Sequence, residues 1–134
     1  MLSFRPATLD PTTTNMYPPP PDLVIQRLNG NVIETISYGK YVIHLTYESG
    51  NRLSIAAPFR FGSAAVYPNT PVNEFPISES SLMRTISCSI VAIRCEEDGT
   101  LELAFSNGDT LIVYANDPMY EAYTLFVDGS EYVV

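Results

Sequence analysis

Two passages of the chain alternate apolar and polar residues with a period of two, and this pattern constrains the fold more than any other feature. The first reads "KYVIHLTYESGNRLSIAAP" and the second reads "TLELAFSNGDTLIVYA". Successive side chains of a β-strand point to opposite faces, so such alternation indicates half-buried strands. Each passage is interrupted by a short polar segment that contains Gly50 or Gly108. Each passage therefore predicts two antiparallel strands joined by a turn.

The two passages also resemble each other. When they are aligned, apolar and turn positions coincide in the pairs Ile43 and Leu101, Leu45 and Leu103, Tyr47 and Phe105, Gly50 and Gly108, and Leu53 and Leu111. A further apolar segment precedes each passage, "VIETI" in one case and "SIVAI" in the other. The sequence therefore predicts a duplicated β unit, with one three-stranded meander in residues 31–57 and a similar one in residues 89–115.

These patterns predict a mainly β protein, either a small antiparallel sandwich or a strongly curved sheet, in a single domain over residues 23–134. One short helix is expected between the meanders, over residues 78–85, with Ser78 as its N-cap. Residues 1–22 contain the run "PPPP" and no apolar periodicity, which predicts a flexible proline-rich arm. Asn29 and Gly30 form a dipeptide typical of hairpin turns.

Positive charge is absent from the last part of the sequence. All 7 Lys and Arg residues precede Glu96, and the formal net charge is −8. The acids from that point on are Glu96, Glu97, Asp98, Glu102, Asp109, Asp117, Glu121, Asp128 and Glu131. Such a surface repels nucleic acid and anionic membranes and attracts a basic protein. Solubility alone is a second, sufficient explanation of the charge.

No combination of residues carries the signature of an enzyme or of a metal site. His44 is the only histidine, so it could serve at most one catalytic arrangement. Cys88 and Cys95 have no further Cys or His nearby to complete a zinc site. The acidic turn that begins at Glu96 lacks the ligand spacing of a calcium loop. We therefore expect no catalytic residue, no metal and no cofactor. The first residues do not form a secretory signal, which leads us to expect a cytoplasmic protein.

The acids and tyrosines of the second half are the candidate partner-binding residues. In "MYEAYTLFV" both faces of the expected strand are apolar, which fits either a central core strand or a strand that presents one face to a partner. We favour the partner for Glu121 and Tyr123, because tyrosine combines a large surface with a polar tip. The candidate set comprises Glu96, Glu97, Asp98, Glu102, Asp109, Tyr114, Asp117, Tyr120, Glu121 and Tyr123.

Two other functions stay open. One is a domain that binds a small ligand or a signal nucleotide, because arginine side chains can hold an anion. Its pocket would be lined by Tyr38, Tyr41, His44, Arg52 and Arg60. The other is a structural or assembly module, and a homodimer is compatible with the sequence.

The segment "EEDGTLELAFSNGDTLIVYANDPMYEAYTLFVDGSEYVV" resembles the C-terminal signature of a family of small, acidic, uncharacterised bacterial proteins. That signature runs an acidic "DGTL-x-L-x-F-x-(D/N)G" hairpin into "P-x-Y-E-(A/S)-W" and a closing "DG" strand. Tyr123 stands where tryptophan is usual, and the resemblance covers residues 23–134. Members of the family look like the immunity proteins that are encoded beside bacterial toxins. The resemblance implies a non-enzymatic inhibitor that neutralises a basic toxin or effector through an acidic C-terminal face.

Overall fold

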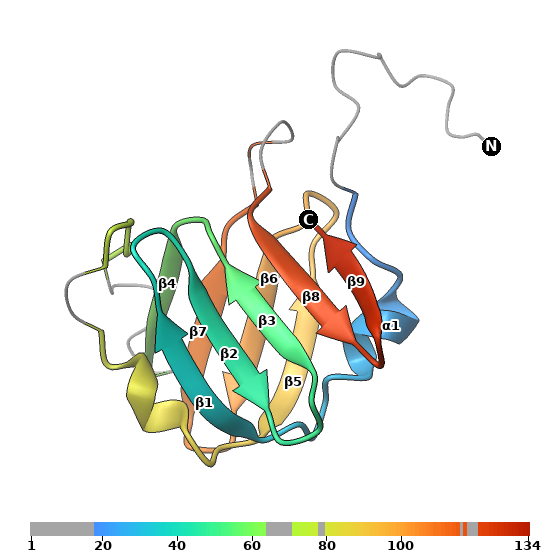
Figure 1. Ribbon diagram of the computed structural model, residues 1–134, viewed down its shortest axis with the longest axis horizontal. Helices are drawn as coiled ribbons and strands as arrows, with labels where there is room; N and C mark the ends of the chain where they lie inside the picture. The colour runs from blue at the N-terminus through green and yellow to red at the C-terminus, as the bar shows by residue number, and fades with distance from the viewer. Residues whose placement is uncertain (1–17, 64–70, 78–79, 116, 118–120) are drawn as a thin grey trace.

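The computed structural model describes residues 18–63, 71–77, 80–115, 117 and 121–134, which form two antiparallel sheets (Figure 1). The five-stranded sheet has the order β1-β2-β3-β8-β9. Its strands are β1 (Ile33–Tyr38), β2 (Ile43–Tyr47), β3 (Arg52–Ile55), β8 (Tyr123–Val127) and β9 (Ser130–Val133). The four-stranded sheet has the order β4-β7-β6-β5. Its strands are β4 (Phe59–Ser63), β7 (Asp109–Val113), β6 (Leu101–Phe105) and β5 (Ile90–Cys95).

The expected mainly β fold is confirmed, and it takes the form of a sandwich. The two sheets lie face to face, one behind the other in Figure 1. Alternate residues of β2, β6 and β8 are buried, as the period-two pattern requires. The core between the sheets is formed by such residues, including Leu45, Leu53, Leu103, Leu111 and Leu125, each with no exposed surface. Burying one such side chain stabilises the fold by about 1.5–3 kcal/mol.

The strands β1-β2-β3 and β5-β6-β7 form two similar meanders. Both begin with an irregularity of register, between Ile33 and Thr35 in one and between Ile90 and Ala92 in the other. Both turn at a glycine with positive φ, Gly50 or Gly108. In both turns the glycine N–H donates to the carbonyl of the aromatic residue at the end of the preceding strand. The resemblance between the two passages of sequence therefore has a counterpart in backbone geometry.

The two meanders meet through a reciprocal set of backbone hydrogen bonds. The N–H of Ile33 donates to the carbonyl of Cys88, and the N–H of Ile90 donates to the carbonyl of Asn31. In the same way Ser87 donates to Ile33 and Gly30 donates to Ile90. Each of these bonds has an equivalent bond in the other half. The halves are therefore related by an approximate two-fold axis that passes between them.

The strand that follows each meander in sequence belongs to the opposite sheet. Strand β4 follows β3 in sequence but pairs with β7, whereas β8 follows β7 but pairs with β3. The first crossover between the sheets comprises residues 56–58, and the second joins the end of β7 at Val113 to the start of β8 at Tyr123. Beyond each exchanged strand the chain returns antiparallel to it. Strand β9 pairs with β8 in this way, and Asn73 forms a single bridge to Phe59 of β4.

The helical elements differ from the expected single helix. An α-helix, α1 (Asp22–Gln26), precedes the first meander, and a 3-10 turn, η3 (Leu82–Thr85), precedes the second. The expected N-cap Ser78 lies outside the described residues, as does most of the expected N-terminal arm. Asn29 and Gly30 follow α1 and lead into β1, rather than joining two strands of a hairpin. A five-residue helix is too short to leave a periodic apolar pattern, which is why the sequence did not reveal α1.

Candidate functional site: an acidic groove

The three consecutive acids Glu96, Glu97 and Asp98 occupy the turn between β5 and β6. The turn is closed by the N–H of Glu96, which donates to the carbonyl of Thr100 at 2.8 Å, and by the N–H of Gly99, which donates to the carbonyl of Glu96 at 2.9 Å. The Asp98 carboxylate accepts the N–H of Thr100 at 2.9 Å. All three acidic side chains are exposed while their backbone is held in place. The carboxylates are therefore presented to solvent from an ordered support.

A second set of residues comes from the two crossovers between the sheets. The N–H of Ala56 donates to the carbonyl of Ala122, and the N–H of Tyr114 donates to the carbonyl of Pro58. These bonds join the crossovers side by side. A cavity of about 210 Å³ opens between them, with Asp117 and Glu121 among its lining residues. Its other walls are small or aromatic, from Ala56, Ala57, Pro58, Tyr114, Ala115 and Ala122.

Tyr114 connects this cavity to the acidic turn. The same residue lines a wide, open depression of about 550 Å³, together with Glu96, Glu97, Asp98 and Thr100. We call the cavity and the depression together the acidic groove. The β5–β6 turn, which contributes Glu96, Glu97 and Asp98 to this groove, lies at the upper end of the sandwich in Figure 1. The fold thus collects five of the expected partner-binding acids around one tyrosine, although they are distant in sequence.

Two cations modify the charge near the groove. The guanidinium of Arg60 lies over the ring of Tyr114, with its central carbon 6.0 Å from the ring centroid. Arg94 pairs with Glu96 at 3.2 Å and also with Glu102. Glu102 belongs to β6 and lines a different, shallow cavity beside Ala92 and Ala104. The structure therefore separates Glu102 from the acidic groove.

Tyr123 is not on the surface, contrary to the expectation that it faces a partner. Its side chain is only 1% exposed. Its hydroxyl donates to the carbonyl of Gly99 at 2.6 Å and lies 3.4 Å from the sulfur of Cys95. Burial, followed by the contact with Cys95, raises the pKa of the Tyr123 phenol, so the hydroxyl stays a neutral donor. Tyr123 therefore anchors the acidic turn from beneath instead of contacting a partner.

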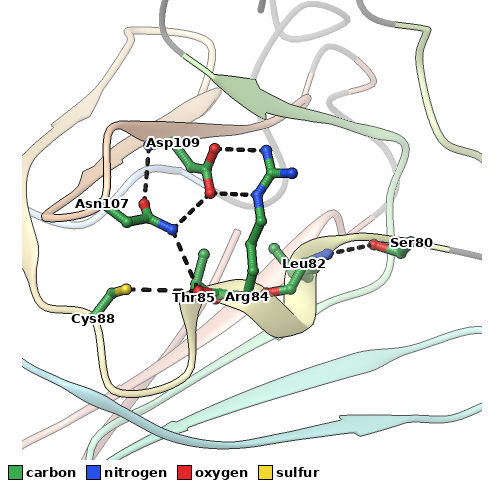
Figure 2. A network of polar contacts seen from close by, with 7 residues as sticks. All are labelled: Ser80, Leu82, Arg84, Thr85, Cys88, Asn107 and Asp109. Carbon is green, nitrogen blue, oxygen red and sulfur yellow. Dashed lines mark hydrogen bonds and ion pairs between the residues drawn. The ribbon is translucent and has the colours of Figure 1, made fainter.

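Asp109 is also buried and is excluded from any partner surface. It is 4% exposed, and Figure 2 shows Arg84 and Asn107 pointing toward its carboxylate. Arg84 donates two hydrogen bonds to it, each 2.7 Å long, and the Asn107 amide donates a third at 2.7 Å. The Arg84 guanidinium and then Asn107 hold the pKa of Asp109 below its usual value, against the opposing effect of burial. This acid therefore ties η3 to the β6–β7 turn.

The residues expected to line an alternative ligand pocket do not form one site. His44 and Arg52 lie on the outer face of the five-stranded sheet, where the His44 ring bonds to Ser54 and Arg52 stacks on Phe126. Arg60 belongs to the other sheet. Tyr38 and Tyr41 flank the turn between β1 and β2. The expected anion site is therefore not assembled, since its two arginines lie on different sheets.

The candidate residue Tyr120 lies outside the residues that the structure describes. Sequence reasoning missed the small residues that line the groove, such as Ala56, Ala57 and Pro58. The segment "IAAP" ends the first meander with two alanines and a proline, which is a signal for a strand ending and not for a site.

Within the described residues, no group of three or more His, Cys, Asp and Glu side chains is arranged to hold a metal ion. None of the helices in those same ranges has the length and apolar character needed to span a membrane.

Comparison with known proteins identifies the family but adds no function. No curated protein and no solved structure matched the chain. One family model, described as "Family of unknown function (DUF6188)", matches residues 24–134. The match begins within α1 and extends over both meanders, both exchanged strands and β9. The chain therefore belongs to this family of unknown function, DUF6188.

Proposed function

We propose that this protein is a non-enzymatic binding domain that neutralises a basic protein, such as a toxin or effector, through the acidic groove. The observation that carries this proposal is the convergence of Glu96, Glu97, Asp98, Asp117 and Glu121 around Tyr114. These residues come from two separate segments that meet at one end of the sandwich. The resemblance to immunity proteins agrees with this role, which needs a complementary surface rather than an active site.

Electrostatics support a basic partner. The net charge of −8 draws a cationic protein toward this domain over distances that exceed direct contact. The backbone of the acidic turn is already ordered by its hydrogen bonds, so little backbone entropy is lost when its carboxylates meet a cation. The Tyr114 ring offers a face for an arginine or lysine side chain, as its contact with Arg60 illustrates. Such a groove suits protruding basic side chains of a folded partner.

The proposal assigns no catalytic role to any residue. His44 lies on the outer face of the five-stranded sheet, where its Nδ1 is 2.6 Å from the Ser54 hydroxyl. The groove therefore draws on carboxylates and a tyrosine, without a histidine from the described residues. Carboxylates and a tyrosine ring both attract cations, so the role that fits these groups is recognition of positive charge.

Parallel co-purification with two charge variants tests this function. The groove variant carries Glu97→Lys, Asp98→Lys and Glu121→Lys. The matched control carries Glu48→Lys, Glu74→Lys and Glu131→Lys, which change three exposed acids outside the groove by the same total charge. We expect the unaltered chain and the control to retain the same basic protein and the groove variant to lose it. Equal retention by the groove variant and the control would refute the proposal.

A further inference from the structure

The cavity between the two crossovers of the chain has small and largely apolar walls. Four alanines and Pro58 line it together with Tyr114. Two of these alanines, Ala57 and Ala122, are 8% and 4% exposed and belong to the hydrophobic core. The cavity therefore exists because side chains of a single carbon leave space where the crossovers meet. A larger side chain at one of these positions would fill that space.

The walls of the cavity are held in place by hydrogen bonds of the backbone. Ala122 accepts the N–H of Ala56 at its carbonyl and donates its own N–H to the carbonyl of Val134. The N–H of Ala115 donates to the hydroxyl of Thr100 at 3.2 Å. Both crossovers are thus fixed to the strands and turns around them. The cavity is therefore formed before any ligand arrives.

Two acids give this apolar space a negative charge. Asp117 and Glu121 line the cavity, and both are exposed. Among the described residues, no ion pair neutralises Glu121. The guanidinium of Arg60 lies over the ring of Tyr114 but does not line the cavity. The cavity therefore has an apolar part and an anionic part.

The size and the chemistry of the cavity select its occupant. Its volume of about 210 Å³ is below the roughly 300–1,000 Å³ of pockets that hold drug-sized molecules, so it suits one side chain. The two carboxylates repel an anion, and a purely apolar side chain would remove water from them without supplying a partner. A long basic side chain satisfies both parts. Its methylene stem can lie against the alanines while its charged end meets the carboxylates.

We infer that this cavity holds a single long basic side chain of the partner, a lysine or an arginine, and so anchors the partner on the groove. The inference rests on the proposed function, because it names the feature of the basic partner that the groove recognises. The open depression beside the cavity, lined by Glu96, Glu97 and Asp98, attracts further cations without selecting their length. Attraction thus belongs to the acidic turn and anchoring to the cavity.

Three peptides test this inference by NMR titration of the full chain. Each consists of diaminobutyrate residues, which carry the charge of lysine on a shorter stem, and differs only at its central position. That position holds lysine, diaminobutyrate or norleucine, which has a long stem without charge. We expect the lysine peptide to bind about tenfold more tightly than the other two, as burial of two further methylene groups beside the charge would give. It should also be the peptide that shifts the amides of Ala56, Ala57 and Ala122.

A pair of uncharged substitutions locates the effect. Ala56→Leu fills part of the cavity, and the crossover should stay in place because Ala56 is bonded through its backbone N–H. Ala92→Leu is the matched control, in the separate shallow cavity beside Glu102. We expect Ala56→Leu to abolish the preference for the lysine peptide and Ala92→Leu to keep it. Thermal unfolding checks that both variants fold.

Two results would overturn the inference and leave the proposed function standing. One is equal affinity of the unaltered chain for the lysine and diaminobutyrate peptides, and the other is a preference for lysine that survives Ala56→Leu. A norleucine peptide that binds as tightly as the lysine peptide would also overturn it, because the cavity would then select apolar stems without charge. Failure of all three peptides to bind would contradict the proposed function as well. Because the peptide comparison uses the unaltered chain, it decides the matter even if Ala56→Leu fails to fold.

Discussion

At the scale of single residues, two side chains that carry polar groups act as internal supports for the surface around them. Tyr123 holds the acidic turn through the carbonyl of Gly99, and Asp109 holds η3 through Arg84. Both belong to segments in which alternation is plain in the sequence. Alternation cannot reveal that a buried tyrosine hydroxyl finds its acceptor in another strand's turn. Nor can it reveal that Arg84, on η3, pairs with Asp109 at the start of β7.

The Tyr123 hydroxyl should contribute measurably to stability. Tyr123→Phe leaves the carbonyl of Gly99 with only the weak thiol donor of Cys95, at 3.6 Å, so we expect the free energy of unfolding to fall by about 1–2 kcal/mol. Chemical denaturation at pH 7 measures this change. Tyr41→Phe, at an exposed tyrosine, is the control and should be nearly neutral. If both variants were equally stable, the hydroxyl would not anchor the turn.

The pair of Arg84 and Asp109 should make stability depend on pH. Because the folded-state pKa of Asp109 is lowered, its contribution is fully present above the unfolded pKa, near 4, and is lost as the pH falls through the folded value. Asp109→Asn removes this contribution while Asn51, its counterpart in the first half, shows that an asparagine fits the position. We expect the free energy of unfolding of this variant to be about 1–2 kcal/mol lower at pH 7. The expected decrease is smaller than for a fully buried ion pair, because solvent screens the half-exposed Arg84. The difference from the unaltered chain should shrink toward pH 3. A difference that is constant with pH would contradict this.

At the scale of elements, the turn between β5 and β6 is shaped by what lies beneath it. Gly99 has φ of +96°, and a Cβ added there would lie 2.9 Å from Cγ1 of Val134 and 3.3 Å from Cβ of Ala115. Gly108, in the next turn, has φ of +91° but has open space around an added Cβ. The two glycines share a backbone conformation and differ in packing. Only the first is pressed against the core.

Alanine substitutions at these two glycines should therefore differ. Gly108→Ala incurs only the cost of the left-handed conformation, about 1–2 kcal/mol. Gly99→Ala adds a clash with Val134, for which we expect a further 1–3 kcal/mol. Comparison of the two free energies of unfolding isolates the packing contribution. Equal losses would show that the acidic turn does not rest on Val134.

At the scale of the whole molecule, the sequence predicts the strands well but not their partners. Alternation and paired glycine turns suffice for both meanders because these features are local. The exchange of β4 and β8 is not local, since each of these strands pairs with a strand of the other half. Because the groove also depends on contacts between distant segments, the sequence identifies its acidic residues but does not show which of them lie together. Its assembly depends on two crossovers that meet at one end of the sandwich.

The exchange also predicts that neither half folds alone. Residues 18–77 would lack β8 beside β3, and residues 78–134 would lack β4 beside β7, so each fragment would leave apolar edges uncovered. We expect both fragments to be unfolded by circular dichroism and by amide exchange. Mixing them should restore β structure. A fragment that folds on its own would show that the exchange is not required for stability.

The central claim is that the acidic groove recognises positive charge, and an NMR titration of the labelled chain with a short lysine-rich peptide tests it most directly. At low salt we expect amide shift changes to cluster at residues 96–100, 114–115 and 121–122, and to vanish as salt is raised. Glu34, Glu48 and Glu131 are exposed acids elsewhere and serve as internal controls. Changes spread evenly over all exposed acids, or confined to sites outside the groove, would contradict the claim.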